Sequence, residues 1–513
     1  MGVLIAIALL QSQFYREGDW ITYSELRKVS AVSYDLRYVY FGSASGIARY
    51  DKFSDGWGDP ISVSDGLISN EIRVCGYDTY SDCLWIVTPQ GIQRYSLSVR
   101  SSDVFPGLKQ SALSIHSIGI GEEAVWFAAD REMIRFRRED EGWSWHMSVP
   151  SDVAWWGRKS VAMLDSSRYS FLSPYYFMDD DFVRYEIAAV ARDERYLWVG
   201  TTGYGAWRYD LLTFQGEHLL YGLAKNRVDC VVKDGNSLWI GGIEGEARGI
   251  TLWDRKTEEF RYFDSFRVPG LNSENVYAIE IAGNLVAFGT DQGVSVYDKR
   301  ENRWRSYTIF DGLRSNDVIS LERDSSYLFC GTDFGLSVLD MKTWELEFAP
   351  QLGNLRIEDI VTTGDTILFA TESGVFFIDK SEPSWKQLSN PDNGLEFGTT
   401  RIAADSSGFW FGTYDGIVSY ERKSGVWDRW TVADHFHIGK VMALAIDASN
   451  LWVGTVWGAL RFSRSTGRWS AYTTEDGLPD PAVLSILVDE DYVWFGTDQG
   501  LTRFHWKSPL VTD

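Results

Sequence analysis

The segment Asp434-His435-Phe436-His437 is the sharpest candidate for metal chemistry in the sequence. Two imidazoles at positions i and i+2 of a loop can contribute to a zinc or copper site. A polar loop with two exposed histidines explains the same residues without a metal. We therefore predict no metal here and keep His435 and His437 as candidate ligand-binding residues.

Four aspartates lie at equivalent turns of a repeat, each one or two residues before a glycine: Asp291, Asp333, Asp415 and Asp498. Carboxylates set around a rim would suit calcium. An aspartate beside a glycine in a tight turn needs no ligand, because its side chain bonds its own backbone. The sequence therefore predicts neither a metal nor another cofactor.

Catalytic signatures are missing from the sequence. It has no His-Glu-x-x-His helix, no Cys-x-x-Cys pair, no glycine loop that would cradle a phosphate and no nucleophile elbow. No spacing places an acid beside a base. We therefore expect a protein that is not an enzyme.

The charge balance excludes two classes of partner. Lys and Arg number 49 against 72 Asp and Glu, a formal charge of −23. A nucleic-acid binder needs a basic face for the phosphates, and an anionic membrane surface attracts basic segments. We predict no nucleic-acid partner and no membrane insertion.

A repeat of about 42 residues positions these candidate residues. One aromatic or apolar position marks each unit: Tyr40, Trp85, Trp126, Trp198, Trp239, Ala287, Phe329, Leu368, Trp410, Trp452 and Trp494. The gap from Trp126 to Trp198 is nearly double the others. Eleven repeats are therefore visible, and a twelfth, degenerate one is implied near residues 160–181.

Each unit holds four short β-like runs separated by turn residues. The second run is apolar on both faces, as in Leu451-Trp452-Val453, so it must be covered on both faces. A four-stranded unit covered on each side by its neighbours is a propeller blade. The fold class predicted is all-β, a β-propeller of about twelve four-stranded blades within residues 13–513.

The unit Leu451–Thr455, Trp469–Thr473 and Asp476-Gly477-Leu478 resembles the two-component regulator propeller repeat. The resemblance covers about residues 19–506. It implies the extracytoplasmic sensor region of a bacterial hybrid histidine kinase or a stand-alone secreted propeller. Only seven residues follow Trp506, so we expect this chain to act without a kinase.

The positions at which the repeat spacing becomes irregular predict the number of propeller rings. The only irregular stretch is about 145–187, and a break there would leave three blades before it, too few for a ring. A single large ring is therefore favoured, with two rings of six plus six or seven plus five blades as the alternative. The first run, Asp19 to Tyr23, matches a fourth strand, whereas the last unit stops after its third. We expect residues 19–24 to pair with residues 500–506, since an open edge would leave backbone groups unpaired.

The N-terminus and two cysteines bear on the compartment. The run from Gly2 to Leu10 is too short to cross a bilayer and is typical of the apolar region of a signal peptide within residues 1–12, although a buried strand is the alternative. We therefore expect a periplasmic or extracellular protein. Cys75 and Cys83 flank a turn, and export would allow a hairpin disulfide; two unlinked thiols are the alternative.

The loops that break the repeat indicate a binding surface. The second-to-third turn, usually small or acidic, carries Tyr204, Phe334, Tyr414 and Trp457 in four blades. The aromatic side chains of Tyr414 and Trp457 should form one patch with Asp415, His435 and His437. This patch would bind a glycan, peptide or protein. The alternative is that these rings plug the central funnel. We thus expect a non-catalytic, extracytoplasmic ligand- or protein-binding propeller of sensor or scaffold type. A cryptic hydrolase or lyase with a site in the funnel is the other hypothesis.

Overall fold

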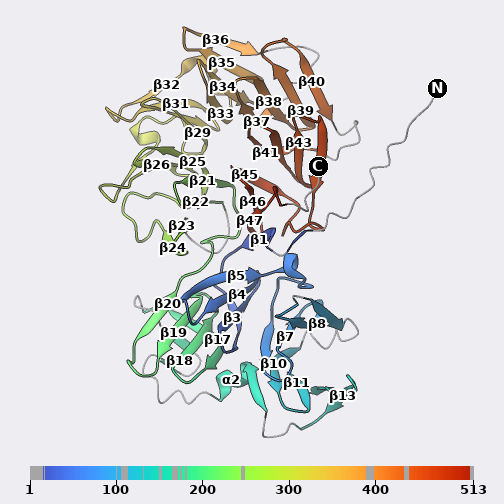
Figure 1. The fold of residues 1–513 in the computed structure, drawn as a ribbon. Helices are drawn as coiled ribbons and strands as arrows, with labels where there is room; N and C mark the ends of the chain where they lie inside the picture. The colour runs from blue at the N-terminus through green and yellow to red at the C-terminus, as the bar shows by residue number, and fades with distance from the viewer. Residues whose placement is uncertain are drawn as a thin grey trace, which may run out of the picture.

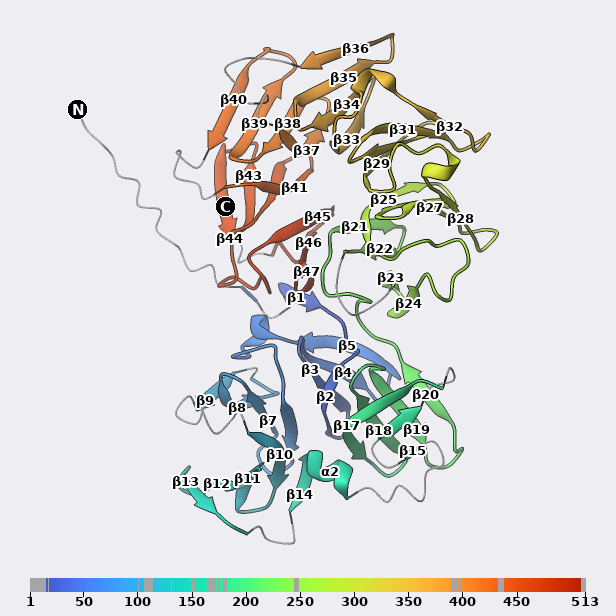
Figure 2. The ribbon, with the colours of Figure 1, turned by 180° about the vertical axis from the view of Figure 1, so that it is seen from behind.

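Eleven antiparallel β-sheets make up the protein in a computed structural model. It describes residues 15–508, apart from 17, 100, 106–113, 131, 149–152, 164–171, 174–175, 179–181, 244–248, 389–394, 396–397 and 432–437. The sheets gather in two lobes that meet at a waist beside β1 (Trp20–Tyr23) (Figures 1 and 2). The all-β class predicted from the repeats is confirmed.

Four sheets form the first lobe, and within each sheet the strands run in order from the innermost outward. They are β2 (Val29–Tyr34), β3 (Tyr38–Ser43), β4 (Gly46–Asp51) and β5 (Gly56–Ile61); β6 (Val74–Asp78), β7 (Cys83–Thr88), β8 (Gly91–Ser96) and β9 (Ser102–Phe105); β10 (Ile115–Ile120), β11 (Ala124–Ala129), β12 (Met133–Arg137) and β13 (Trp143–His146); β17 (Arg184–Arg192), β18 (Tyr196–Thr201), β19 (Ala206–Asp210) and β20 (Gly216–Leu219). Strand β6 packs against β2 and β10, strand β17 packs against β2, and residues 154–162 bridge β10 to β17. This closed set is called the first ring.

Seven sheets form the second lobe. They are β21 (Cys230–Asp234), β22 (Ser237–Gly241), β23 (Ile250–Asp254) and β24 (Glu259–Phe263); β25 (Val276–Ala282), β26 (Leu285–Thr290), β27 (Gly293–Asp298) and β28 (Arg303–Tyr307); β29 (Val318–Asp324), β30 (Tyr327–Thr332), β31 (Gly335–Asp340) and β32 (Leu346–Phe348); β33 (Ile357–Thr363), β34 (Thr366–Thr371), β35 (Gly374–Asp379) and β36 (Glu382–Leu388); β37 (Thr399–Ala404), β38 (Gly408–Thr413), β39 (Gly416–Glu421) and β40 (Trp427–Thr431); β41 (Val441–Ile446), β42 (Asn450–Thr455), β43 (Gly458–Ser463) and β44 (Arg468–Tyr472); β45 (Val483–Asp489), β46 (Tyr492–Thr497), β47 (Gly500–Phe504) and β1. Strand β21 packs against β45 and closes this second ring.

The N-terminal strand completes the last sheet. Strand β1 pairs antiparallel with β47, from Trp20 opposite Phe504 to Tyr23 opposite Leu501. The indole of Trp20 stacks on the Phe504 ring at 4.0 Å between centroids. The predicted pairing of the two chain ends is confirmed.

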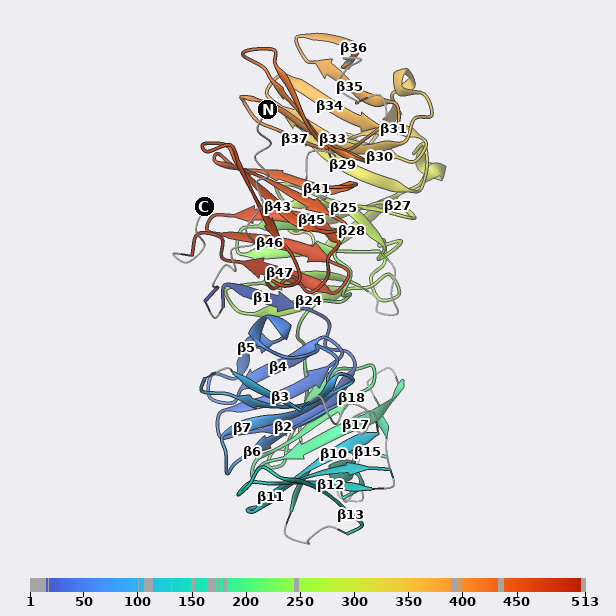
Figure 3. The same cartoon turned by 90° about the vertical axis from the view of Figure 1, so that its right-hand side faces the viewer.

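Two rings replace the single ring favoured from the spacing (Figure 3). A glycine near the end of most second strands records the closure. A Cβ on Gly454 would lie 2.6 Å from the Val483 carbonyl oxygen of the next sheet, and one on Gly496 would lie 2.5 Å from the Val228 oxygen, just before β21. A Cβ on Gly200 would likewise collide with Val29. The crossover lies between β20 and β21, where the repeat spacing is regular, so spacing gave no sign of it.

The centre of the first ring is filled by a strand of its own chain. Strand β14 (Ala154–Gly157) pairs with the inner edge of β10 and contacts β2, β6 and β17. The Trp156 indole donates to the Tyr77 carbonyl oxygen at 3.2 Å and meets the Tyr34 ring edge-on. A Cβ on Gly76 would lie 2.5 Å from Trp156, so only glycine admits the indole there.

The degenerate blade expected near 160–181 is not a separate sheet within the described residues. Helix α2 (Arg158–Ala162) contacts β14, β10 and β17, and so occupies the sector between two sheets. The short strands β15 (Leu172–Ser173) and β16 (Tyr176–Met178) add to the first half of β17. The chain between β13 and β17 fills the ring centre and does not form a blade of its own. The first ring therefore has four blade-like sheets, with helix α2 in the place of a fifth.

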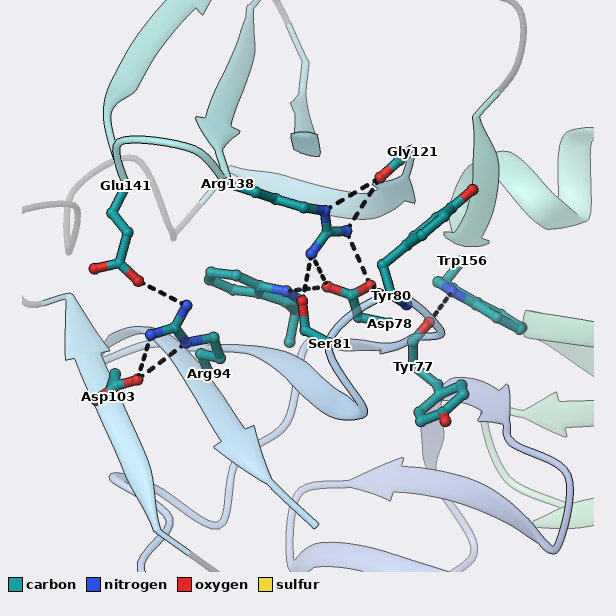
Figure 4. Close-up of polar contacts among 11 residues, drawn as sticks. Tyr77, Asp78, Tyr80, Ser81, Arg94, Asp103, Gly121, Arg138, Glu141 and Trp156 are labelled. Atoms are coloured by element: carbon teal, nitrogen blue, oxygen red, sulfur yellow. Dashed lines mark hydrogen bonds and ion pairs between the residues drawn. The ribbon is translucent and has the colours of Figure 1, made fainter. Parts of the chain in front are cut away.

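Ion pairs tie neighbouring sheets together on one face. In the first ring, the Arg138 guanidinium reaches from its own sheet to the buried Asp78 carboxylate, at 2.5 and 2.9 Å (Figure 4). Trp85 also donates to Asp78. The second ring repeats this pairing at Lys299–Asp234, Lys380–Asp324 and Arg464–Asp405, and Arg255–Asp489 does so across its closing junction. A charged turn thus anchors each of these sheets to the one before it.

The rings share a core at the waist. The Trp57 ring of β5 lies 4.5 Å from that of Tyr221, and the Tyr221 ring meets that of Phe260 in β24 edge-on at 5.5 Å. Trp57 donates through Nε1 to the Leu220 carbonyl oxygen, 2.9 Å away, within the crossover. These contacts pack β5 and the crossover against the second ring.

The cysteines are unlinked. Cys75 lies opposite Ile86 and Cys83 lies opposite Asp78, so the two are not paired across the hairpin. Their side chains belong to apolar clusters on opposite faces of the sheet, which is why the hairpin disulfide is wrong. Burial raises the pKa of both thiols to about 12.

The expected signal peptide, residues 1–12, lies outside the described residues. Among the residues that the structure does describe, no helix has the length and apolar character needed to cross a membrane.

Candidate functional site

One face of each ring carries the second-to-third turns and the connections between sheets, and is called the loop face. In the second ring the six of these turns that open with a threonine are built alike. Thr455 donates through Oγ1 to the Gly458 carbonyl oxygen at 3.0 Å and accepts from the Trp457 amide at 3.0 Å. Because threonine and glycine hold the turn, the side chain between them is free to face outward. Thr332 holds Phe334 in the same way.

Tyr414 and Trp457 lie on neighbouring sheets of this face and are 52% and 64% exposed. The segment before β41 runs between them. Lys440 places Nζ 5.2 Å from the Tyr414 ring centroid, and a Cβ on Gly439 would lie 3.6 Å from the Trp457 Nε1. Tyr414, Lys440 and Trp457 therefore form one continuous exposed patch, called the aromatic patch.

Asp415 adds a carboxylate beside the aromatic patch. It accepts from Arg429 at 2.8 Å and from the Thr413 hydroxyl at 2.9 Å. His435 and His437, expected in the same patch, lie outside the described residues. The structure thus joins Tyr414, Asp415 and Trp457, and it adds Lys440, which the sequence argument passed over.

Phe334 belongs to the same face but not to the same patch. The sheet that begins with β33 separates it from Tyr414. Phe334 is 47% exposed, and the Arg314 guanidinium lies 5.5 Å from its ring and 5.2 Å from that of Phe348. At this site the Arg314 guanidinium therefore lies between two exposed aromatic rings.

Tyr204 lies in the first ring, away from the other predicted residues. Its ring stacks on His218 at 4.1 Å and contacts Phe177 and Tyr185 at 5.0 and 5.1 Å. The hairpin of β15 and β16 supplies Phe177, so this tyrosine is half-buried in an aromatic cluster.

The turn aspartates line the mouth of the second ring. Asp498 accepts from Arg227 at 3.0 Å, and Asp291 accepts from Asn275 at 2.9 Å. Burial, together with the nearby Asp480 carboxylate, raises the pKa of Asp498. No three His, Cys, Asp or Glu side chains of the described residues converge as metal ligands would.

Sequence reasoning missed a set of carboxylates on the innermost strands of the second ring. Glu322 accepts from the Thr362 amide of the next sheet at 2.8 Å, and Asp359 accepts from the Ile402 amide of the sheet after it at 2.8 Å. Burial raises the pKa of Glu280 to about 7, and burial with the nearby Glu280 carboxylate raises that of Glu322 to about 8. Acidic residues inside otherwise apolar inner strands were the available signal.

Comparisons with known proteins support the architecture. The fold is similar to PorZ, an essential bacterial surface component of the type-IX secretion system of Porphyromonas gingivalis, at 15% identity and a TM-score of 0.64 over 95% of this chain and 87% of that one. It is also similar to the extracellular domain of the putative hybrid two-component system BT4673 from B. thetaiotaomicron, at 14% identity and a TM-score of 0.49 over 94% and 70%.

A third solved structure is an enzyme. Virginiamycin B lyase from Staphylococcus aureus matches at 13% identity and a TM-score of 0.43, over 54% of this chain and 94% of that one. No protein-family model and no curated protein matches the chain. The likeness to PorZ shows a shared fold, and a fold by itself assigns neither binding nor catalysis.

Proposed function

We propose that the protein is a non-catalytic, extracytoplasmic propeller of sensor or scaffold type that captures a ligand or partner on the loop face of its second ring. The aromatic patch carries this proposal. Most tryptophans at repeat positions are buried between sheets, whereas Trp457 lies in a turn that needs no indole to form. Exposed aromatic side chains next to a cation and a carboxylate are typical of binding surfaces.

The location outside the cytoplasm rests on two further observations. The apolar run from Gly2 to Leu10 has the length of a signal-peptide core. PorZ, whose fold is similar along most of its length, is described as a bacterial surface component. The partner class is a glycan, a peptide or a protein, because aromatic rings with flanking polar groups suit all three.

The test is capture of immobilised glycans and peptides by the full chain. Tyr414→Ala with Trp457→Ala should lower binding to the selected hits at least about tenfold, since central aromatic anchors carry most of a binding energy. The matched control is Tyr327→Ala with Trp145→Ala, which removes exposed rings elsewhere. Equal loss in both variants, or no loss in the first, would place the site elsewhere.

A second candidate function is a hydrolase or lyase in the channel of the second ring. It is favoured by Glu280 and Glu322, neighbouring carboxyl groups whose pKa values of about 7 and about 8 suit general acid work at neutral pH. Incubation with pooled glycans and peptides tests it. Turnover that is lost in Glu280→Gln and in Glu322→Gln would support catalysis and displace the binding proposal.

A further inference from the structure

Exposed apolar side chains of the second ring gather on the loop face. Eight of the ten large ones lie there: Phe266, Ile309, Phe310, Phe334, Phe348, Tyr414, Val456 and Trp457. Tyr327 and Val426 lie on the opposite face. Since the turns on both faces serve the same sheets, folding alone does not require this asymmetry, and it indicates a docking surface.

The same face is acidic. The described second-to-third turns of the second ring hold five acidic residues and neither lysine nor arginine: Asp291, Asp333, Glu372, Asp415 and Asp498. The third-to-fourth turns on the opposite face are basic instead and include Arg255, Lys299, Lys380 and Arg464. Those four basic side chains are engaged by acidic residues of neighbouring sheets.

Three of the loop-face carboxylates stand close together and form no ion pair within the described part of the chain. Asp333 donates its amide to the Asp317 carbonyl oxygen at 3.2 Å, and neither residue, nor Asp291, has an ion-pair partner among the described residues. The Oδ1 atoms of Asp291 and Asp333 are buried without a hydrogen-bond partner in that part of the chain. Burial and the Asp333 and Asp291 carboxylates raise the pKa of Asp317.

The nearby cations are already engaged. Arg356 donates to Glu358 at 2.8 Å, and Arg314 donates to Asn354 at 2.7 Å while its guanidinium stacks between Phe334 and Phe348. The stacking shows that these exposed rings accept a guanidinium on their faces. Arg356 and Lys225 act on these carboxylates only from a distance, so Asp291, Asp317 and Asp333 keep no ion-pair partner among the described residues, next to rings that suit cationic and apolar side chains.

We propose that the loop face of the second ring binds a basic, extended segment of a partner protein, with lysine or arginine side chains at Asp291, Asp317 and Asp333 and apolar side chains over the neighbouring exposed rings. The inference rests on the proposed function and names its partner class. Charge complementarity selects this occupant. A second copy fits less well, because its opposite face offers two large apolar side chains and turns whose charges are largely paired.

The probe is a fluorescein-labelled peptide of twelve residues that alternates arginine, leucine and glycine, with glutamate in place of arginine as its control. Fluorescence anisotropy with the full chain should show binding of the arginine peptide only, and it should weaken as salt is raised. Asp291→Asn with Asp317→Asn and Asp333→Asn should weaken binding about tenfold or more.

The matched control removes three exposed acids from the opposite face: Glu301→Gln, Asp365→Asn and Glu490→Gln. It makes the net charge less negative by the same three units as the first triple variant, and it should change binding less than about twofold. Equal weakening in both triple variants, or no binding to the wild-type chain, would overturn the proposal. If the first triple variant does not fold, Asp317→Asn alone gives the same comparison.

Two other outcomes separate the proposals. Sedimentation velocity that shows a dimer dissociated by the same three substitutions would make a second copy the occupant and overturn the inference. If the wild-type chain does not bind the arginine peptide but still captures glycans or peptides through Tyr414 and Trp457, only the partner class is overturned. Failure of the Tyr414 and Trp457 test would overturn the proposed function itself.

Discussion

The two rings differ in what lies at their centres. In the first ring, β14 pairs with β10 and places Trp156 against Gly76 and Tyr34, so the centre is filled by side chains. In the second ring, none of the described strands pairs with the inner edge of an innermost strand. The inner strands carry Glu280 and Glu322 instead.

The difference follows from the number of sheets around each axis. Four sheets leave a gap that one strand and helix α2 close, and the free backbone groups of β10 gain partners. Seven sheets close on themselves, so acidic side chains of one inner strand bind backbone amides of the next. The first ring is thus stabilised by a filled centre, whereas the second ring keeps acidic side chains on its inner strands.

Removal of residues 1–24 should have the largest effect, because it opens only the second ring. Trp20, Ile21 and Tyr23 are buried in the last sheet, and the loss of their burial costs about 5 kcal/mol. Hydrogen exchange should increase first in β45, β46 and β47, with β2 to β13 protected longer. Removal of residues 1–14 alone is the control; an unchanged melting temperature after the longer deletion would contradict the role of β1.

Trp156→Ala should do the reverse and weaken the first ring. The cavity and the lost bond to Tyr77 should lower the free energy of unfolding by about 3 kcal/mol. Exchange should rise in β6, β10 and β14 but not in the second ring. Trp145→Ala removes an exposed indole, so it should lower the free energy of unfolding by less than about 0.5 kcal/mol. Similar costs for both variants would refute a filled centre.

Arg138→Met should cost about 2 kcal/mol, since it leaves the buried Asp78 charge with only its remaining hydrogen bonds. The equivalent change in the second ring, Lys299→Met, removes a more exposed pair and should cost about 0.5 kcal/mol. Urea denaturation of the two variants measures the contrast (Figure 4 shows the Arg138 site). A larger loss for Lys299→Met would reverse the ranking.

The smallest effect concerns pH and the second ring. The folded-state pKa of Glu322 lies above its ordinary value of 4.5, at about 8, so the folded chain binds more protons than the unfolded chain. Stability should therefore fall as pH rises from about 4.5 to about 8 and stay flat below that window. In Glu322→Gln, the decrease in the free energy of unfolding across this pH window should be smaller by about 1 kcal/mol. Urea midpoints at pH 5 and pH 8 test it; an unchanged slope in the variant would place the pH dependence on other groups.

Repeat chemistry made the local structure predictable. Every position that marks a unit, from Tyr40 to Trp494, lies in a second strand, and the pairing of β1 with β47 followed from an unpaired edge. The aromatic patch was half predicted, because residues that depart from a repeat, such as Tyr414 and Trp457, stand out in the sequence. Lys440 was missed, because its contact with Tyr414 depends on the relative orientation of two neighbouring sheets.

The sequence by itself determined the strands, the turns and the identity of the edge that β1 must cover, because these depend on apolar periodicity and glycine within about 42 residues. Only the tertiary structure decided that the sheets close as two rings, that β14 fills one centre, and that Asp291, Asp317 and Asp333 lie close together on the loop face of the other ring. Closure depends on the angle between successive sheets, and that angle is the sum of many side-chain contacts. Each contact is compatible with either outcome, so no local pattern in the sequence records the result.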